Sequence, residues 1–403
     1  MSTRAQAHAW IAILGLVAPC VAPAQDRPER DLVDLVVRDG PHARAIRAEA
    51  DVVRREQDAR LAYPNPVVMY SREGAGFTEF LQVEQALPIF GIRGALSRAG
   101  VAASIAAQAD RDARLWRLRA DATAAVVRLG SEQARLEAVA AHVEELDRLI
   151  GVLRTREQEG EGSRFDRLRA EQEWRDVRHA ATAAAVSVAD ARAHLGALLP
   201  ADVVVTRVAT DLGLPRAVAP VETLTAQASS SRAELRALQL SAERATLEAD
   251  AARKGRWPAP TLFGGLKRSD TDKGRENGGV FGVNLAVPLF DNGSREAARW
   301  NAERTRIDAE RASIEHEIRR EIVRASEALI LRQAALAQDE AGAADNLTRI
   351  AHVAFREGDV GILELLDATR TASRARLRTI DLKLDARLAQ IALERAVGDH
   401  LWP

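Results

Sequence analysis

The sequence predicts a mainly α-helical protein with a small β part, in which one structural unit occurs twice along the chain. Three observations lead to this prediction: the composition, the positions of the prolines and an internal repeat. The 403 residues are 47% hydrophobic and 29% charged but only 4% aromatic, a mixture typical of long helices and coiled coils. The length is sufficient for two or three ordinary domains.

The prolines mark where long helices can form. All 14 lie outside residues 89–199 and 289–402, and proline disrupts a helix interior. Each of these two stretches is interrupted once by glycine-rich residues, at 159–163 and at 357–361. Because such residues favour turns, we predict two antiparallel helical hairpins.

Within these stretches the apolar residues follow a coiled-coil pattern. From Leu115 to Leu153 they recur every three or four positions, which is the spacing of a coiled-coil seam. We expect one long helix at 93–157, about 97 Å long at 1.5 Å per residue, and a second at 294–356. Shorter helices are expected at 164–199 with 222–254 stacked on its end, and at 360–398 with 42–62 stacked on its end.

The proline-bounded windows that precede the two stretches match each other. YPNP (63–66) and LPIFG (87–91) correspond to WPAP (257–260) and VPLFD (287–291). The offset is about 200 residues, which indicates a duplication rather than a short solenoid repeat.

Both windows, 63–90 and 257–290, are predicted to be β-hairpins. VFGVNLAVP (280–288) alternates apolar residues with small or polar ones, which is the period of a strand. Turns are expected at 73–76 and 269–279. Nine of the 16 aromatic residues lie in these windows, which favours membrane strands with an interfacial aromatic belt over two soluble hairpins.

Residues 1–24 have the pattern of an export signal peptide. Arg4 precedes a run of about ten apolar residues, and Ala22-Pro23-Ala24 resembles a cleavage site. The run is too short to span a bilayer as a helix. Cys20 leaves lipidation open as an alternative, although Pro19 fits that processing route poorly.

The duplication divides the rest of the chain into repeats. The first repeat is expected at 25–200, with its helical hairpin at 93–199, and the second at 222–403, with its helical hairpin at 293–398. An equatorial connector at 201–221 joins them. One chain thus supplies four strands, too few to close a membrane barrel, so several copies must share one.

Five segments of this sequence resemble a known family. Over about residues 30–400 the chain resembles the outer-membrane factor family, the TolC-like outer membrane efflux proteins, and is most similar to its CzcC-like heavy-metal efflux branch. The segments that carry the resemblance are LPIFGIRG (87–94), EGEGSRFDRLRAEQ (159–172), VPLFDNGSREA (287–297), FREGDVGILELLDATRTASRAR (355–376) and LERAVGDHL (393–401).

The resemblance implies a TolC-like fold and a homotrimer. Three chains would form a trimeric α-barrel of twelve helices and a shared 12-stranded transmembrane β-barrel in outer-membrane lipid, with most of the chain in the periplasm. The implied function is that of a passive export duct in a tripartite efflux system. Its implied partners are a periplasmic adaptor (membrane fusion) protein and an inner-membrane efflux pump of the RND type, and its implied cargo is heavy-metal cations.

The resemblance also implies roles for individual residues. Glu364 and Asp367 match an acidic ring at the channel entrance, which would favour cations; a solvated helix face is the alternative. Asp166 and Phe355 match an entrance latch, although Val360 stands where some members have arginine. The turns that would meet the adaptor contain Gly160, Gly162, Ser163, Gly358, Asp359 and Gly361.

The sequence offers no pattern for catalysis, cofactor binding or metal binding. It has one cysteine, and none of its eight histidines pairs with another at helical spacing, so we expect no metal site and mostly surface histidines. The net charge of -1 argues against nucleic-acid binding. We expect no enzyme. The remaining alternative is a structural periplasmic coiled-coil or adaptor protein without a channel, which would need one helical hairpin flanked by β-rich domains.

Overall fold

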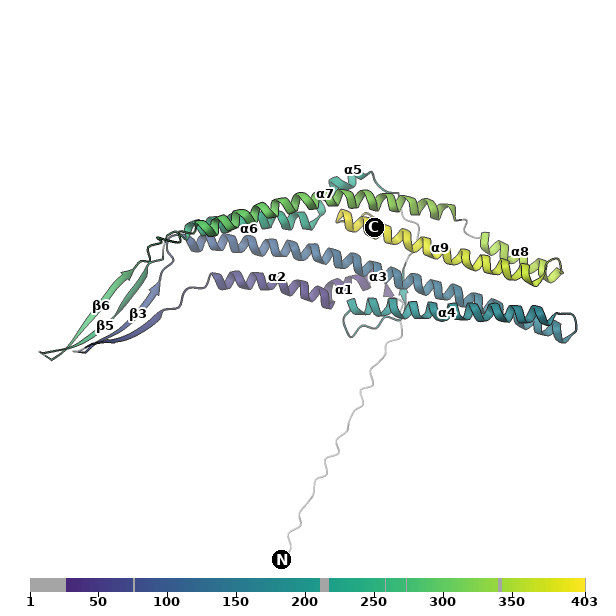
Figure 1. The fold of residues 1–403 in the computed structure, drawn as a ribbon, viewed down its shortest axis with the longest axis horizontal. Helices are drawn as coiled ribbons and strands as arrows, with labels where there is room; N and C mark the ends of the chain where they lie inside the picture. Colours follow the sequence, from purple (N-terminus) through teal and green to yellow (C-terminus); the bar gives the residue numbers. More distant parts are fainter. Residues whose placement is uncertain are drawn as a thin grey trace, which may run out of the picture.

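The computed structural model describes residues 27–74, 77–210, 217–257, 259–272, 274–339 and 343–402. The expected signal peptide at 1–24 and Cys20 lie outside these residues. The chain is elongated, with a small sheet at one end and helices that run lengthwise from it (Figure 1).

The two halves of the chain repeat one order of elements. In the first half the order is α1 (Glu29–Asp39), α2 (Pro41–Arg60), β2 (Val67–Glu73), β3 (Thr78–Ala86), α3 (Ile92–Gln158) and α4 (Arg164–Leu198). In the second half it is α5 (Val221–Ser231), α6 (Ala233–Lys254), β5 (Thr261–Thr271), β6 (Gly274–Asn284), α7 (Ser294–Gln338), α8 (Ala343–Glu357) and α9 (Ile362–Val397). The mainly α, TolC-like fold class predicted from the sequence is confirmed.

The hairpins from the two halves form one four-stranded antiparallel sheet. Its order is β2-β3-β5-β6, with Leu81 opposite Leu266 where the hairpins join. β5 and β6 continue through most of 269–279, which we had predicted to be a turn, and β6 ends before the alternating residues 285–288. The large apolar side chains of the sheet are exposed, and most of them share one face. That face carries Val68, Tyr70, Leu81, Val83, Leu262, Leu266, Phe281 and Val283, whereas Val67 and Met69 lie on the other.

The central helix α3 contacts most of the other helices. Near the sheet it packs against α2 and α6, and farther along against α4 and α9, while α7 lies beside α6 and then α9. The predicted seam is buried at Leu118, Ala122, Leu129, Leu146 and Leu153. Among the described residues, no helix is both long enough and apolar enough to cross a bilayer.

The short helices of each half break where they meet the end of a long one. α1 and α2 are separated by Gly40, and a Cβ there would lie 2.7 Å from the carbonyl oxygen of Leu198 at the end of α4. α5 and α6 are separated by Arg232, which donates to the carbonyl of Arg395 in α9 at 3.2 Å. Ser231 donates to the carbonyl of Val397 at 2.7 Å.

The structure corrects the sequence predictions for the short helices. The helix expected at 222–254 is divided at Arg232, and α1 precedes the helix expected at 42–62. The stacking partners were also wrong, because α4 meets α1 and α2 while α9 meets α5 and α6. Helix length does not distinguish the two pairings, whereas apolar packing does: Leu32 and Val36 of α1 share a buried cluster with Leu195 of α4.

The second long helix is also interrupted. We expected one helix at 294–356, but α7 ends at Gln338 and α8 begins at Ala343. At the break Asp339 adopts an extended conformation, with φ −79° and ψ 99°. Its carboxylate accepts a hydrogen bond from the hydroxyl of Thr379 in α9, so the end of α7 coincides with a side-chain contact to the neighbouring helix.

The connector between the halves lies against α3. Its strand β4 (Val208–Ala209) pairs in parallel with β1 (Arg27–Pro28). Gln133 of α3 donates to the carbonyl of Thr206 at 3.0 Å and accepts from the backbone of Val208 at 3.2 Å. Thr210 packs over Gly130, where a Cβ would lie only 2.2 Å from the threonine hydroxyl.

A buried ion pair joins the two halves near the sheet. Arg60 of α2 donates to both carboxylate oxygens of Glu248 in α6, at 2.6 and 2.9 Å. The Glu248 side chain is 2% exposed and that of Arg60 is 39% exposed. Gln57 shares this contact and packs against Gly100 of α3, where a Cβ would lie 3.2 Å from its own.

Replacing Glu248 should therefore destabilise the fold. In Glu248→Ala the Arg60 guanidinium loses its partner, and we expect a loss of about 2 kcal/mol, below the value for a fully buried pair because Arg60 keeps contact with water. Thermal unfolding in detergent measures the difference. Glu243→Ala on the exposed face of α6 is the control. If both variants unfold at the same temperature, the Arg60–Glu248 pair does not stabilise the fold.

Candidate functional site

The two helical hairpins end together at the end of the molecule farthest from the sheet (Figure 1). This turn end consists of the α3–α4 turn at 159–163, the α8–α9 turn at 358–361 and the adjoining helical residues. Every site residue suggested by the resemblance lies here, so the structure brings together the acidic, latch and turn residues.

The two turns share one backbone motif. Gly160 and Gly358 have φ of +79° and +83°, the left-handed region that glycine adopts without strain. After each glycine, the next backbone N–H reaches back into the preceding helix. The N–H of Glu161 donates to the carbonyl of Arg156 at 2.9 Å, and the N–H of Asp359 donates to the carbonyl of Ala354 at 2.9 Å. This is the Schellman arrangement that ends a helix.

Other turn residues also have local structural roles. Ser163 caps α4, because its hydroxyl accepts from the backbone of Phe165 at 3.1 Å. A Cβ on Gly162 would lie 2.9 Å from the Cβ of Arg156, and one on Gly361 would lie 2.9 Å from the Glu364 carboxylate. A Cβ on Gly160 or Gly358 would meet nothing within 4 Å, so these two glycines border open space.

The predicted acidic residues lie on one exposed face of α9. Glu364 and Asp367 are three residues apart and both exposed, while Leu365 and Leu366 between them are buried. The leucines pack into an apolar cluster with Leu146 of α3 and Ala170 of α4. This packing orients α9 and keeps both carboxylates in solvent.

The predicted latch residues have separate surroundings. Asp166 lies half-buried in the first turn of α4, where a negative charge favours the helix dipole. Phe355 of α8 packs against the apolar cluster of the turn end. The guanidinium of Arg156 lies 5.6 Å from its ring centre. The latch therefore stays a prediction.

Sequence reasoning missed a contact between the two hairpins. Arg370 of α9 forms a two-pronged ion pair with Glu173 of α4, with its Nε 3.0 Å from one carboxylate oxygen. Arg370 is 37% exposed and Glu173 is 12% exposed. The guanidinium holds the pKa of Glu173 below its usual range. The two residues are 197 positions apart, close to the repeat offset, so near-equivalent positions of the two repeats meet.

A second missed contact involves histidine. His352 of α8 lies 2.9 Å from the carboxylate of Glu145 in α3, and His142 lies 3.7 Å from the other carboxylate oxygen. His142 is 2% exposed, so the expectation of surface histidines is wrong at this position. The two imidazoles, His142 foremost, lower the pKa of Glu145 to about 2.

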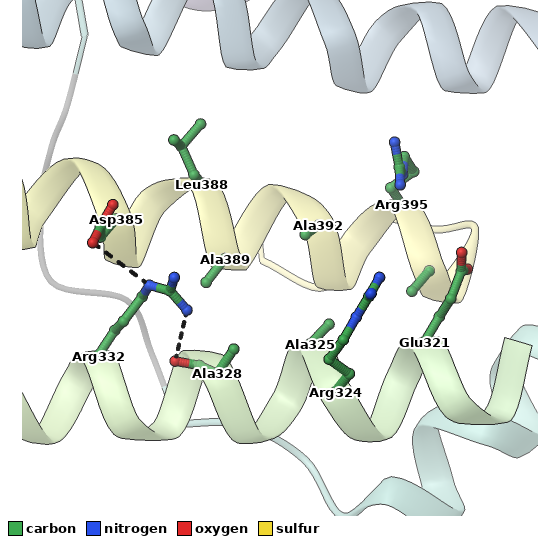
Figure 2. A pocket seen from close by; sticks show the side chains of 11 residues that line it. Glu321, Arg324, Ala325, Ala328, Arg332, Asp385, Leu388, Ala389, Ala392 and Arg395 are labelled. Atoms are coloured by element: carbon green, nitrogen blue, oxygen red, sulfur yellow. Dashed lines mark hydrogen bonds and ion pairs between the residues drawn. The ribbon is translucent and has the colours of Figure 1, made fainter.

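Two of the hollows along the helices are bordered by the second hairpin. One of about 380 Å³ lies between α3 and α8 and is lined by Glu145, Arg148, Leu149, Val152, Arg156, His352, Phe355 and Arg356. The other, about 290 Å³, lies between α7 and α9 (Figure 2). Alanines form much of its floor, and Arg332 reaches across to Asp385 at 3.9 Å. Among the described residues no three His, Cys, Asp or Glu side chains are grouped so as to hold a metal ion.

Comparisons with known proteins agree with this architecture. The chain is similar to a membrane protein from Pseudomonas aeruginosa, with 18% identity over 92% of both chains and a TM-score of 0.74. CusC is 16% identical over 93% of this chain and 92% of its own, with a TM-score of 0.70. The open state of the Neisseria gonorrhoeae MtrE outer membrane channel is 17% identical over 93% and 89%, with a TM-score of 0.69.

The long helices, the small sheet and these likenesses show that the chain shares the fold of these proteins. Residues 224–399 match the family model described as outer membrane efflux protein. This second part of the chain is therefore similar to the outer membrane efflux proteins. A comparison with curated proteins finds no match, and the CzcC-like branch stays a prediction.

The Glu173–Arg370 pair gives a pH-dependent prediction. Because the pKa of Glu173 is lowered in the fold, the pair stabilises the protein above the ordinary carboxyl pKa of about 4.3, and this stabilisation is lost as the pH falls through the lowered value. Arg370→Gln should cost about 1 kcal/mol at pH 7, since the arginine is partly exposed.

Unfolding in detergent at pH 7 and at progressively lower pH measures this effect. The difference between wild type and Arg370→Gln should shrink on acidification. Arg374→Gln, at an exposed position one turn farther along α9, is the matched control. A difference that is the same at every pH would show that the ion pair is not its origin.

Proposed function

We propose that the chain is the outer-membrane channel of a tripartite efflux system, a passive export duct assembled from three copies. The observation that carries the proposal is the uncovered sheet at the end of the long helices. Most of its exposed apolar side chains share one face of the sheet; Phe281, for example, is 90% exposed. An exposed apolar surface of this kind needs a partner, and membrane lipid is the partner that fits an outer-membrane factor.

The edges of the sheet support assembly. In the described part of the chain, β2 and β6 each pair on one side only. Free strand edges are not tolerated in lipid. Because strand direction alternates from β2 to β6, β6 of one copy is antiparallel to β2 of the next. Three copies then supply twelve strands for one closed transmembrane barrel.

The helices support a wall around water. The 67 residues of α3 extend about 100 Å, and the buried residues fall into three small clusters rather than one central core. Charged side chains cover much of the remaining helical surface. Three copies would place twelve helices around a periplasmic tunnel, with one flank of each copy against its neighbour.

The turn end would form the entrance of this tunnel. Three copies would bring Glu364 and Asp367 together as six carboxylates, which favour cations over anions in a narrow passage. Heavy-metal cations are the cargo that we propose. They would pass without a binding site, because the chain only conducts what a pump delivers.

The two turns would meet the periplasmic adaptor, and through it an inner-membrane pump of the RND type. Gly160 and Gly358 border open space and lie on similar turns, so one adaptor element could meet each of them in a similar way. A periplasmic adaptor or other coiled-coil protein without a channel is less well supported, because the chain has two helical hairpins and an exposed four-stranded sheet rather than one hairpin between β-rich domains.

The acidic ring gives a test in planar bilayers. Glu364→Gln combined with Asp367→Asn should lower the cation-to-anion permeability ratio several-fold, because six carboxylates are removed from the entrance. Reversal potentials in a salt gradient measure the ratio. Glu144→Gln with Asp147→Asn, an exposed acidic pair of equal spacing on α3, is the control.

An equal change in both double variants, or no change in either, would remove the acidic-ring assignment. A purified protein that forms no pore and stays monomeric and water-soluble without detergent would remove the channel proposal itself.

The docking turns give a separate test. Gly160→Trp with Gly358→Trp adds bulk to both turns and should reduce export in cells at least tenfold while the trimer remains intact in outer-membrane fractions. Gly160→Asn with Gly358→Asn is the control, because asparagine tolerates the left-handed backbone. Normal export by the tryptophan variant would show that the adaptor docks elsewhere.

A further inference from the structure

Helix α8 is a separate segment of the second hairpin. It has 15 residues and is separate from α7, which ends at Gln338 (Figure 1). α8 packs on α9 and reaches α3 through side chains of the turn end. A short helix that is separate from α7 and ends at a glycine turn can shift as a unit without bending α7, so its contacts with α3 bear on the shape of the entrance.

The contact between α8 and α3 contains a carboxylate between two imidazoles. His352 lies 2.9 Å from one oxygen of Glu145, and the buried His142 lies 3.7 Å from the other. Glu145 is itself only 17% exposed. The low pKa of Glu145, about 2, keeps its carboxylate charged throughout the pH range in which imidazoles gain or lose a proton.

Other charged groups also face this contact. Arg148 and Arg156 line the hollow from α3, as does Arg356 from α8, whose Nε lies 3.4 Å from the carbonyl of His352. These arginines oppose a further positive charge.

From α4, Glu173 has its pKa lowered by Arg370 of α9 and, to a smaller extent, by His142, so it is a second carboxylate near this contact. Glu145 is the group in direct contact with His352. Because electrostatic energy falls with distance, this direct attraction outweighs the repulsion from the three arginines.

We propose, on the basis of the channel function above, that the Glu145–His352 contact is a proton-sensitive restraint that holds α8 against α3 and keeps the entrance narrow. When His352 is neutral, the contact is a hydrogen bond to a carboxylate. When His352 gains a proton the contact becomes an ion pair with a charge-assisted hydrogen bond, which is stronger. Acid therefore tightens the entrance, and a neutral or mildly alkaline periplasm loosens it.

The test combines a functional and a structural measurement on the full-length trimer. Between pH 8 and pH 5.5 on the entrance side of a planar bilayer, the open probability of the wild type should fall roughly two- to fivefold, the range expected for one partly exposed ion pair. Hydrogen exchange of α8 peptides, corrected for the intrinsic effect of pH, should slow over the same interval.

His352→Gln keeps a hydrogen-bond donor but cannot titrate, so it should abolish both pH effects, and Glu145→Gln should do the same. His179→Gln, at an exposed position on α4, is the matched control and should keep both effects. A wild type without either pH effect, or His352→Gln with the full effects, would overturn the proposal.

The two measurements separate this inference from the proposed function. If the trimer conducts at no pH, the channel proposal fails, while the exchange of α8 still decides whether the contact responds to protons. If it conducts with no pH effect on open probability or exchange, the channel stands and the restraint fails.

Discussion

The packing along α3 is the constraint on which the rest of the structure depends. This helix contacts α1, α2, α4, α6 and α9, so it joins both halves of the chain. Its buried residues change along its length: from 95 to 113 they are alanine and glycine, whereas from 146 to 153 they are leucine and isoleucine. Small residues let neighbouring helices approach closely, and large ones fill the wider space at the turn end. The register of the other helices follows from this one surface.

Much of the fold could be predicted because its determinants are local in sequence. Proline-free stretches and a three-four apolar spacing define α3, and glycines define the turns to within a few residues. The break between α7 and α8 could not be predicted, because it coincides with a contact between Asp339 and Thr379 on another helix. The stacking of the short helices could also not be predicted, because the two possible pairings have similar summed lengths. Only side-chain packing distinguishes one pairing from the other.

The candidate site, too, could be predicted from the sequence only in part. The turn glycines could be identified from sequence, because a left-handed backbone position favours glycine wherever it occurs. The contacts that join the hairpins, Glu173 with Arg370 and Glu145 with His352, connect residues about 200 positions apart, and no local pattern marks them. The duplication itself offered a clue to the first, because near-equivalent positions of a repeat can meet where the two halves pack. The position of Val360 therefore does not leave the hairpins unconnected, since they are joined about two to three helical turns away from it.

The alternating direction of the four strands has a consequence for stoichiometry. An even number of alternating strands presents opposite directions at the two margins of the sheet, so copies of this chain can follow one another around a ring without any mismatch in hydrogen bonding. That rule is satisfied equally by two, three or four copies. The number of copies in the ring must therefore be decided by the angle at which the helical flanks meet, and substitutions on those flanks, rather than in the strands, are where a ring of different size would arise.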